Sequence, residues 1–501
     1  MIFYRRLSKA LVCALSLAMP LSVTAQTKIA VLSDIHVMNP QLVKSDGMAW
    51  QNALSRERKL LDYSHEAFDM MVEKFLTDKP HIVLITGDLT KDGEQASHEY
   101  VVAGLDKLHQ AGISVYVIPG NHDLGTANAL IYDGETTTKA PVADAAAFEE
   151  LYQPYGYGTT STREATTLTY ACEPVAGLVL IGIDSGKSGV LSDTTLDWVC
   201  QQAGQARNQG KRVIAMMHHP LFPHVTGADK LSSTYSIKDH EKIRNRLVDA
   251  GIRIILTGHV HVSDIAKDYN AVVSDSIYDV NTGSTISYPC DYRIMTLSQD
   301  LSQLSIQTGH ITSLPSDNDY TGTAKKRYQD YVKGYASTFI SNDMYGQILA
   351  AIATIHAEGN ENLSADAKSF LSLYDMAKVS LQANATFNDA LKARGGTWED
   401  ADAAINSMLQ DISSYGIERR ADQTDDLELT IHLPKSNDSA TGHVKGDIDR
   451  NGEVNITDAV ALVSIILDKG QISNRYWADI DGSGMVNIGD TVELIRFILG
   501  D

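Results

Sequence analysis

The sequence predicts an α/β protein in which two packed sheets are flanked by helices. Three observations support this class. Short apolar runs that are typical of buried strands alternate with stretches that carry apolar residues at helical spacing. Five of these runs end in a polar stretch rich in Asp, His, Asn or Gly. After residue 261 the helical spacing stops and strand patterns follow one another, which favours a second sheet-forming segment.

The expected elements follow in order along the chain. The strands with polar ends cover residues 29–32, 82–85, 115–118, 213–217 and 254–256. Helical spacing covers residues 60–76, 99–108, 192–206 and 237–248, and each of these stretches leads into the next strand. The later strands are expected at 271–273, 277–280, 293–297 and 304–307. This order lets the carboxyl ends of several strands meet at one edge, where α/β folds bind ligands.

Residues 1–25 are expected to be a signal peptide. They combine a basic start at Arg5, Arg6 and Lys9 with a short apolar core at 11–17 and a small-residue cleavage site at Val23-Thr24-Ala25. A membrane helix is the alternative, but Pro20 interrupts a segment that is already short for a span. No later segment is apolar enough to cross a membrane. We therefore expect secretion to the periplasm, the cell surface or the medium.

The net charge limits the classes of partner, and the cysteine content limits the disulfides that can form. The formal net charge is −21, and the leader contributes basic residues only, so the mature chain is more acidic still. Such a charge argues against a nucleic acid as a standing partner. A small phosphate ester stays acceptable where bound cations supply positive charge. After cleavage Cys172, Cys200 and Cys290 remain, so at most one internal disulfide can form, and no pairing is assigned.

The five polar stretches carry the chemistry. They are Asp34-Ile35-His36, Gly87-Asp88, Gly120-Asn121-His122-Asp123, His218-His219-Pro220 and Gly258-His259-Val260-His261. Their side chains offer the oxygen and nitrogen donors of a divalent-metal site. In Asp34-x-His36 and His259-x-His261, alternate residues of an extended segment share one face, so both can approach the same site. The hypothesis is a two-metal hydrolase.

These motifs, in this order, resemble the calcineurin-like metallophosphoesterase family over roughly residues 28–310. The resemblance implies a four-layer αββα sandwich for a catalytic domain at 26–315. It also implies that Asp88 bridges two divalent transition metals, whose mixed ligands tolerate Mn, Fe or Zn. The implied ligands are Asp34, His36 and His261 for the first metal and Asn121, His218 and His259 for the second. Family members carry the ligand two residues before the proline, which selects His218 over His219.

The resemblance also assigns an acid. In the family, the His of G-N-H lies beside the scissile bond and is proposed to protonate the leaving oxygen, a role worth roughly 10²–10⁴-fold. Here that residue is His122, and Asp123 can orient it; alternatively, His122 only stabilises the bound phosphate. Purple acid phosphatases carry a metal-binding tyrosine where Lys91 stands, so a tyrosine-ligated ferric centre is not expected. Residues 87–94 are more similar to the bacterial class III cyclic nucleotide and glycerophosphodiester phosphodiesterases.

Three regions downstream of the motifs are expected to have other roles. The insertion at 124–166, with tyrosines at 152, 155 and 157, is either a lid or substrate wall or a solvated surface loop. Residues 316–429 show helical spacing at 325–339, 344–356, 365–381 and 398–412, which predicts a helical accessory domain. Residues 430–445 are expected to be a linker because Pro434, Ser436 and Asn437 interrupt any regular pattern.

Residues 446–501 contain a repeat with an offset of 32 residues, each copy a twelve-residue loop followed by an amphipathic helix. The loops place oxygens at the positions of a calcium loop, with Gly at the sixth. The first would use Asp447, Asp449, Asn451, the Glu453 carbonyl, Asn455 and Asp458, and the second Asp479, Asp481, Ser483, the Met485 carbonyl, Asn487 and Asp490. These loop–helix pairs resemble type I dockerin modules, which implies two calcium ions and a cohesin-like partner. A calcium-stabilised cap is the alternative.

The leading hypothesis is a secreted phosphoesterase that hydrolyses phosphate esters, phosphodiesters above all, by metal-activated water attack with a His general acid. A broad phosphomonoesterase or nucleotidase is the second possibility, because the ligand sets of these activities barely differ. A third is a non-catalytic component of a cohesin–dockerin type assembly. The full donor set together with His122 argues against the third, since decayed sites usually lose ligands.

Overall fold

The computed structural model describes residues 26–158, 160–222, 224, 236–270, 275–340, 389, 392, 397, 399, 428–433, 446, 448, 454–467, 480 and 488–499. The expected signal peptide, the strand at 271–273 and the helices at 344–356, 365–381 and 398–412 lie outside these residues, apart from isolated positions. Within the described part of the chain, none of the helices is long and apolar enough to cross a membrane.

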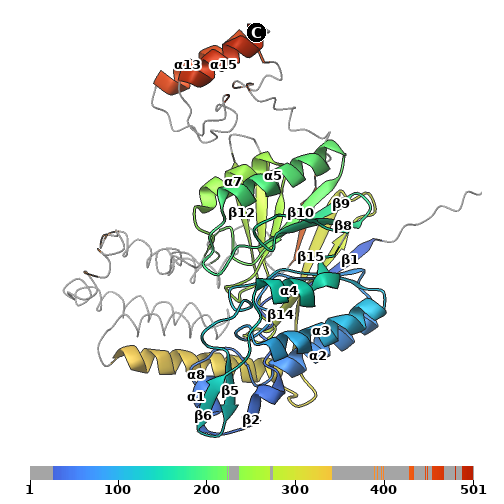
Figure 1. The fold of residues 1–501 in the computed structure, drawn as a ribbon, viewed down its shortest axis with the longest axis vertical. Helices are drawn as coiled ribbons and strands as arrows, with labels where there is room; N and C mark the ends of the chain where they lie inside the picture. The colour runs from blue at the N-terminus through green and yellow to red at the C-terminus, as the bar shows by residue number, and fades with distance from the viewer. Residues whose placement is uncertain are drawn as a thin grey trace, which may run out of the picture.

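Two large sheets form the centre of the molecule, and Figure 1 shows them stacked between helices. The first has the order β16-β15-β14-β1-β3-β4, with bounds Glu428–His432, Gln303–His310, Asp291–Leu297, Thr27–Leu32, Ile82–Ile85 and Ser114–Val117. The second has the order β12-β13-β11-β10-β9-β8-β7, with bounds Asp264–Asn270, Asp275–Asn281, Ile254–Thr257, Arg212–Met217, Leu178–Ile183, Tyr170–Val175 and Thr162–Arg163. The expected mixed α/β architecture is confirmed.

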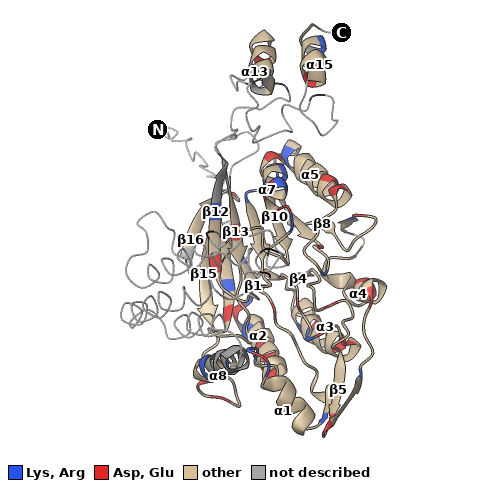
Figure 2. Ribbon diagram, turned by 90° about the vertical axis from the view of Figure 1, so that its left-hand side faces the viewer, with Lys and Arg blue, Asp and Glu red and all other residues tan. Residues whose placement is uncertain are grey.

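Helices cover the outer face of each sheet. The main ones are α2 (Ser64–Asp78), α3 (Gln95–Gln110), α5 (Asp193–Asn208) and α7 (His240–Asp249). Figure 1 shows α2 and α3 on the side of the first sheet and α5 and α7 on the side of the second. In Figure 2 the charged residues of α5 and α7 stand out against strands that are mostly uncharged. The helices expected at 60–76 and 237–248 begin at Ser64 and His240 instead, a few residues later.

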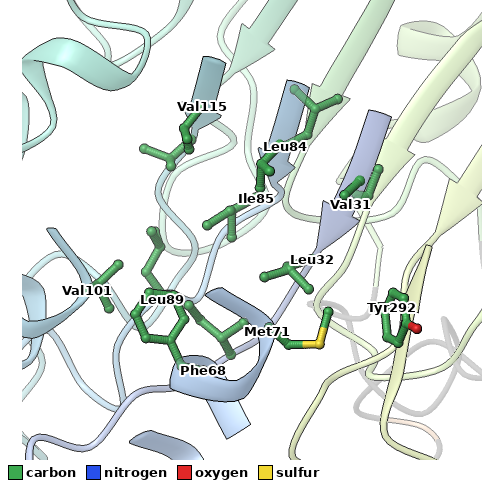
Figure 3. Packing of buried hydrophobic residues seen from close by; sticks show 14 of the residues in the cluster. Val31, Leu32, Phe68, Met71, Leu84, Ile85, Leu89, Val101, Val115 and Tyr292 are labelled. Atoms are coloured by element: carbon green, nitrogen blue, oxygen red, sulfur yellow. The ribbon is translucent and has the colours of Figure 1, made fainter. Parts of the chain in front are cut away.

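Alternation along β10 shows how the layers are held together. Ile214 and Met216 belong to the hydrophobic cluster that joins the two sheets, whereas Val213, Ala215 and Met217 belong to the cluster under α5 and α7. Successive residues of a strand point to opposite faces, so one buried strand serves both layers. On the other side of the molecule, Phe68 and Met71 of α2 pack toward the strands of the first sheet (Figure 3). Each such buried side chain contributes roughly 1.5–3 kcal/mol.

The strand directions bring the polar stretches together. β1, β3 and β4 run parallel, and so do β9, β10, β11 and β13. The segments after β1 and β3 remain paired beyond the strands, because Asp34 N donates to Gly87 O at 3.0 Å and His36 N donates to Asp88 O at 2.9 Å. Gly258 N donates to His218 O at 3.0 Å in the same way between the ends of β10 and β11. The carboxyl ends of the parallel strands in both sheets therefore lie on the same side, where the polar stretches meet.

The insertion at 124–166 is a packed part of the fold. It contributes β5 (Leu130–Asp133), β6 (Thr136–Lys139), α4 (Ala145–Leu151) and the short helix η2 (Gln153–Tyr155), and β5 pairs with both β2 (Val43–Ser45) and β6 beside α1 (Met48–Leu54). Tyr152, Tyr155 and Tyr157 are buried in the main hydrophobic cluster. A solvated loop is therefore the wrong interpretation for this aromatic cluster. A role of the insertion as a substrate wall stays a prediction.

The prediction of a linker at 430–445 is wrong for its first residues. Residues 428–432 form β16, which pairs antiparallel with β15 at the edge of the first sheet. Ile431 and Leu433 are buried there, because alternate apolar residues of the strand face the core. The rest of the expected linker, apart from Leu433, lies outside the described residues.

The helix α8 (Tyr320–Ile340) lies within the region expected to be a helical accessory domain, and its first turns pack on the sandwich. Tyr320 is fully buried and donates from Oη to Thr285 O at 3.1 Å. Arg327 pairs with Asp62 at 2.9 Å. These contacts tie α8 to the segments that precede α2 and follow β13.

The C-terminal repeat forms a pair of helices, α13 (Ile456–Leu467) and α15 (Ile488–Leu499). Leu462 and Leu494, which occupy equivalent places in the two copies, are fully buried in one small hydrophobic cluster. The repeat seen in the sequence is therefore also a repeat in the packing.

Candidate metal centre

The side chains of the five polar stretches meet where the strands of both sheets end. Asp34 and His36 follow β1, Asp88 follows β3, and Asn121 and His122 follow β4. From the second sheet, His218 follows β10, and His259 and His261 follow β11. Two groups of donors form, Asp34–His36–Asp88–His261 and Asp88–His218–His259, and within each the donor atoms lie within 4.8 Å of one another.

The backbone at these positions is unusual. Asp34, His36, Asp88, His259 and His261 all have positive φ angles, between 40° and 72°. Residues with side chains rarely adopt this left-handed conformation, and it persists only where surrounding contacts enforce it. The hydrogen bonds between the loops supply those contacts, so they direct the donor side chains inward.

Two glycines allow the loops to approach each other. A Cβ on Gly120 would lie 2.2 Å from Asp88 Oδ1, and a Cβ on Gly258 would lie 1.9 Å from Ser33 Oγ and 2.6 Å from Asp34 Oδ2. All three distances are far shorter than any van der Waals contact. The glycines of the G-N-H-D and G-H-x-H stretches are therefore required by close packing against carboxylates.

The first group is compact and buried. His36 Nε2 lies 3.1 Å from His261 Nε2, and Asp34 Oδ1 lies 3.2 Å from His261 Nε2 and 3.9 Å from His36 Nε2. Asp34 and His36 are fully buried. Burial lowers the pKa values of His36 and His261, which favours neutral imidazoles with a free lone pair.

The second group shares a carboxylate with the first. Asp88 Oδ2 lies 3.5 Å from His36 Nε2 of the first group and 3.4 Å from His218 Nε2 of the second. Asn121 Oδ1 lies 2.9 Å from both His218 Nε2 and His259 Nδ1, so the amide completes the second group. Burial alone would lower the pKa of His218, but the charges of Asp88 and Asp34 raise it to about 9.

The donors fit two divalent cations. Two imidazole Nε2 atoms face each other at 3.1 Å in the first group, and among the described residues the buried Asp34 Oδ1 meets no hydrogen-bond donor in good geometry. In the second group an amide oxygen faces two imidazole nitrogens. Electron-rich atoms converge in this way around a cation, since buried acceptors otherwise lack compensation. One oxygen of Asp88 is placed to serve both groups.

Surrounding hydrogen bonds orient the donors. His218 Nδ1 donates to Thr86 O at 2.9 Å, which leaves Nε2 as the donor atom toward the site. His261 Nδ1 lies 3.0 Å from Ser287 Oγ, and Asp34 Oδ2 accepts from Ser33 Oγ at 2.6 Å and from His259 N at 2.9 Å. Such partners fix the tautomer and ring orientation of metal-binding residues.

The structure separates His218 from its neighbour. His219 turns its Nδ1 to Ser185 Oγ at 2.8 Å, away from the donor groups, although its ring lies 4.5 Å from that of His259. Burial lowers the pKa of His219 to about 2, so it stays neutral. The preference for His218 as a candidate ligand agrees with this placement, and His219 supports the wall behind it.

His122 lies beside the first group with its Nδ1 held from behind. Its ring centroid is 4.9 Å from that of His36, and its Nδ1 donates to Lys91 O at 2.8 Å and to Asp92 Oδ1 at 2.9 Å. Burial alone would lower the pKa of His122, but the charge of Asp88 and the hydrogen bond with Asp92 raise it above its ordinary value. Nε2 is thus the nitrogen available to a ligand.

The expectation that Asp123 orients His122 is wrong. Asp123 is fully buried and accepts from Thr90 N at 2.9 Å, Leu89 N at 3.1 Å and Gly120 N at 2.8 Å, so it holds the Asp88 loop against the His122 loop. The reason is the turn after Gly120, which directs neighbouring side chains to opposite sides. Asp92 takes the orienting place instead. Asp92 belongs to the stretch Gly87–Glu94, but it lies 30 residues before His122 in the sequence, and nothing in the pattern indicated that the two side chains would meet.

Lys91 occupies the place where a metal-binding tyrosine would stand in purple acid phosphatases. Its buried Nζ pairs with Asp92 and lies 3.3 Å from Asn128 O. Burial alone would raise the pKa of Asp92, but the hydrogen bond from His122 and the charge of Lys91 lower it to about 2. Lys91 therefore helps to keep the partner of His122 ionised.

The calcium loops fall largely outside the described residues. Of the twelve expected ligands, Asn455, Asp458 and Asp490 are described. Asp458 is fully buried and accepts from Ile448 N at 2.6 Å and Asn455 N at 2.8 Å, and Asp490 is fully buried at the equivalent position. Asp458 thus points into its own copy, and neither acidic side chain is exposed to solvent.

The fold and the shared donor groups define a metallophosphoesterase-type protein, and comparison with known families specifies it further. The model of the calcineurin-like phosphoesterase family matches residues 27–263, and that of the dockerin type I domain matches residues 445–499. The chain therefore carries a calcineurin-like metallophosphoesterase domain and a C-terminal type I dockerin domain.

Curated relatives are distant. A probable cyclic nucleotide phosphodiesterase of Rhodococcus erythropolis is 26% identical over 194 residues, covering 38% of this chain and 54% of that protein. A second one, from Synechococcus sp. strain WH7803, is 23% identical over 199 residues, covering 39% of this chain and 64% of that protein. The chain thus spans little more than half to just under two thirds of the length of these relatives.

The solved structures that the chain resembles also have low sequence identity to it. A dimetal phosphatase from Danio rerio superposes with a TM-score of 0.41 and 11% identity, covering 57% of this chain and 97% of that one. A purple acid phosphatase from yellow lupin superposes with a TM-score of 0.38 and 10% identity, covering 57% of this chain and 52% of that one.

Proposed function

We propose that this protein is a secreted phosphoesterase with a dinuclear metal centre, and that it hydrolyses phosphodiesters. The observation that carries the proposal is the pair of buried donor groups joined by Asp88 Oδ2. Asp34, His36, Asp88 and His261 would hold one cation, and Asp88, Asn121, His218 and His259 the other. When bound, two such cations clamp the ester oxygens and lower the pKa of water.

The chain's own residues supply the proton for the leaving group. His122 is the candidate general acid, because Asp92 and Lys91 O hold its Nδ1 and leave Nε2 toward the donor groups. The charge of Asp88 and the hydrogen bond with Asp92 raise the pKa of His122, which favours its protonated form. Asp123 keeps the loops of Asp88 and His122 in register, so the carboxylate and the acid are positioned together.

The preference for diesters rests on the relatives rather than on the site. The curated relatives are named as probable cyclic nucleotide phosphodiesterases, and the stretch Gly87–Glu94 is similar to that branch. The acidic chain favours a small ester over a polyanion.

Hydrolysis of bis-p-nitrophenyl phosphate and p-nitrophenyl phosphate tests the proposal, with protein reconstituted in turn with Mn, Zn and Fe. We expect a higher kcat/KM on the diester, and loss of both activities in His218→Ala but not in the exposed control His109→Ala. A higher kcat/KM on the monoester would favour a phosphomonoesterase. Inactivity of every metal form on both esters would count against an enzyme.

The dockerin domain supports a second part of the proposal, a calcium-dependent partner outside the cell. Ile456 and Val460 of α13 and the equivalent Ile488 and Val492 of α15 are exposed. Each pair lies one turn apart on its helix, so each copy presents an apolar strip of the same kind. We assign these strips to a cohesin-like protein on a scaffold.

A pull-down with the full chain, with and without calcium, tests the partner. We expect capture of a cell-surface protein in calcium, and its loss with Ile456→Asp combined with Ile488→Asp. Glu493→Gln, a polar change on α15, serves as the matched control. A module that binds calcium but captures no such protein would be a structural cap.

A further inference from the structure

Lys59 places a buried positive charge at the edge of the candidate metal centre, and the reaction proposed above gives it no role. The residue is 9% exposed. Among the described residues its Nζ makes no hydrogen bond, and its ion pair with Glu57 Oε2 is 3.7 Å long. The side chain of Lys59 is largely buried and its ion pair with Glu57 is long, so its ammonium can bind an anionic ligand that reaches it.

Contacts on both sides of Lys59 hold it against the loops of the centre. Leu60 N donates to Ile286 O at 2.7 Å, and Ile286 precedes Ser287, the partner of His261 Nδ1. Arg58 Nη2 donates to Val260 O at 3.4 Å, and Val260 stands between His259 and His261. The segment that carries Lys59 is thereby fixed beside the first donor group.

Three imidazoles of the centre meet beside this segment. The ring of His36 lies 4.9 Å from that of His122 and 5.0 Å from that of His261. Lys59 stands between Arg58 and Leu60, which contact the segments that carry His261 and its partner Ser287, so it lies near these rings and the candidate general acid.

We propose that Lys59 binds a second anionic group of the substrate, a carboxylate or a further phosphate, close to the ester oxygen that leaves. The inference rests on the proposed function and names its substrate class: small phosphate esters with an additional negative charge near the leaving group. Arg58, which is partly exposed beside Lys59, widens the positive surface. A charge-assisted contact of this kind favours an ester that carries the additional negative charge over one that lacks it.

Binding of O-phosphoserine and O-phosphoethanolamine tests the proposal, because these probes differ by one carboxylate. Affinities are measured by calorimetry on the metal-reconstituted full chain, and Lys59→Met, Lys59→Arg, Glu57→Gln and the exposed control Lys107→Met are compared. We expect the wild type to bind O-phosphoserine roughly tenfold tighter. Lys59→Met should abolish the preference, Lys59→Arg should keep it, and Glu57→Gln should keep or increase it.

The outcomes separate this inference from the proposed function. A wild type that shows no preference or binds neither probe, or a Lys59→Met variant that keeps the preference, overturns the role of Lys59. Equal weakening of both probes in Lys59→Met also overturns it, since the lysine would then contact the phosphoryl group common to both. A preference that depends on Lys59 in a protein inactive on every ester would uphold the inference while the proposed hydrolysis fails.

Discussion

Asp92→Asn tests the assignment of His122 as the general acid. The substitution keeps the size of the side chain but removes the charge that His122 Nδ1 meets at 2.9 Å. A charge-assisted hydrogen bond is worth about 1.5–3 kcal/mol net. If the transition state loses the lower end of this range, about 1.5 kcal/mol, the rate drops about tenfold. That drop is a fraction of the 10²–10⁴-fold that general acids contribute, because Lys91 O still holds the ring.

The assay compares two diesters with different leaving groups. Bis-p-nitrophenyl phosphate releases p-nitrophenolate, which needs little help from an acid, whereas a cyclic nucleotide releases an alkoxide that needs a proton. We expect Asp92→Asn to slow the cyclic nucleotide about tenfold more than the nitrophenyl ester. The exposed control Glu99→Gln should change neither rate.

The pH profile gives an independent check. Asp88 and Asp92 raise the pKa of His122, so protonated His122 is present at low pH and is lost as pH rises through that value. Removal of the Asp92 charge should therefore move the alkaline limb of the kcat profile to lower pH. An equal loss on both substrates with an unmoved limb would refute the reasoning and leave Asp92 a purely structural residue.

Three further predictions follow from single contacts. Gly258→Ala should abolish metal binding, measured by elemental analysis, because the new Cβ would lie 2.6 Å from Asp34 Oδ2; retained metal would contradict the packing argument. His224 is buried between Asp264 and Asp279, and their charges outweigh burial and raise its pKa to about 10. That stabilisation is complete below the ordinary histidine pKa and should fade as pH rises toward 10, so the free energy of unfolding measured in urea should fall over this range. His224→Gln should be less stable by about 3–5 kcal/mol and should not show this fall. Calcium removal should lower the melting temperature of the C-terminal helices without changing ester hydrolysis, and an unchanged melting profile would argue against the calcium loops.

Much of the catalytic fold could be predicted from residue pattern alone. Strands such as Ile82–Ile85 are short and wholly apolar, and each is followed by a stretch that could not be buried without polar partners. All seven candidate ligands are brought together by the structure in two groups that share Asp88. The motif order carried this information because each motif sits at a strand end, where topology alone brings it to the common edge.

Other features depend on contacts that a linear pattern does not contain. Asp123 is next to His122 in the chain, yet the turn after Gly120 directs it to the Thr90 backbone, and Asp92 reaches the imidazole from another loop. The strand Glu428–His432 is short, and it becomes recognisable only through its pairing with Gln303–His310, far earlier in the chain. The positive φ angles of the candidate ligands are likewise imposed by neighbouring loops.

Metal content of the purified chain tests the central claim most directly, namely that one carboxylate joins two cation sites. Elemental analysis of the wild type reconstituted with Mn or Zn should find about two transition-metal ions per chain, one for each donor group. His218→Ala should retain about one, and Asp88→Ala should retain almost none, because Asp88 Oδ2 lies within 3.5 Å of donors in both groups. Two ions remaining in Asp88→Ala, or fewer than one in the wild type, would contradict the account.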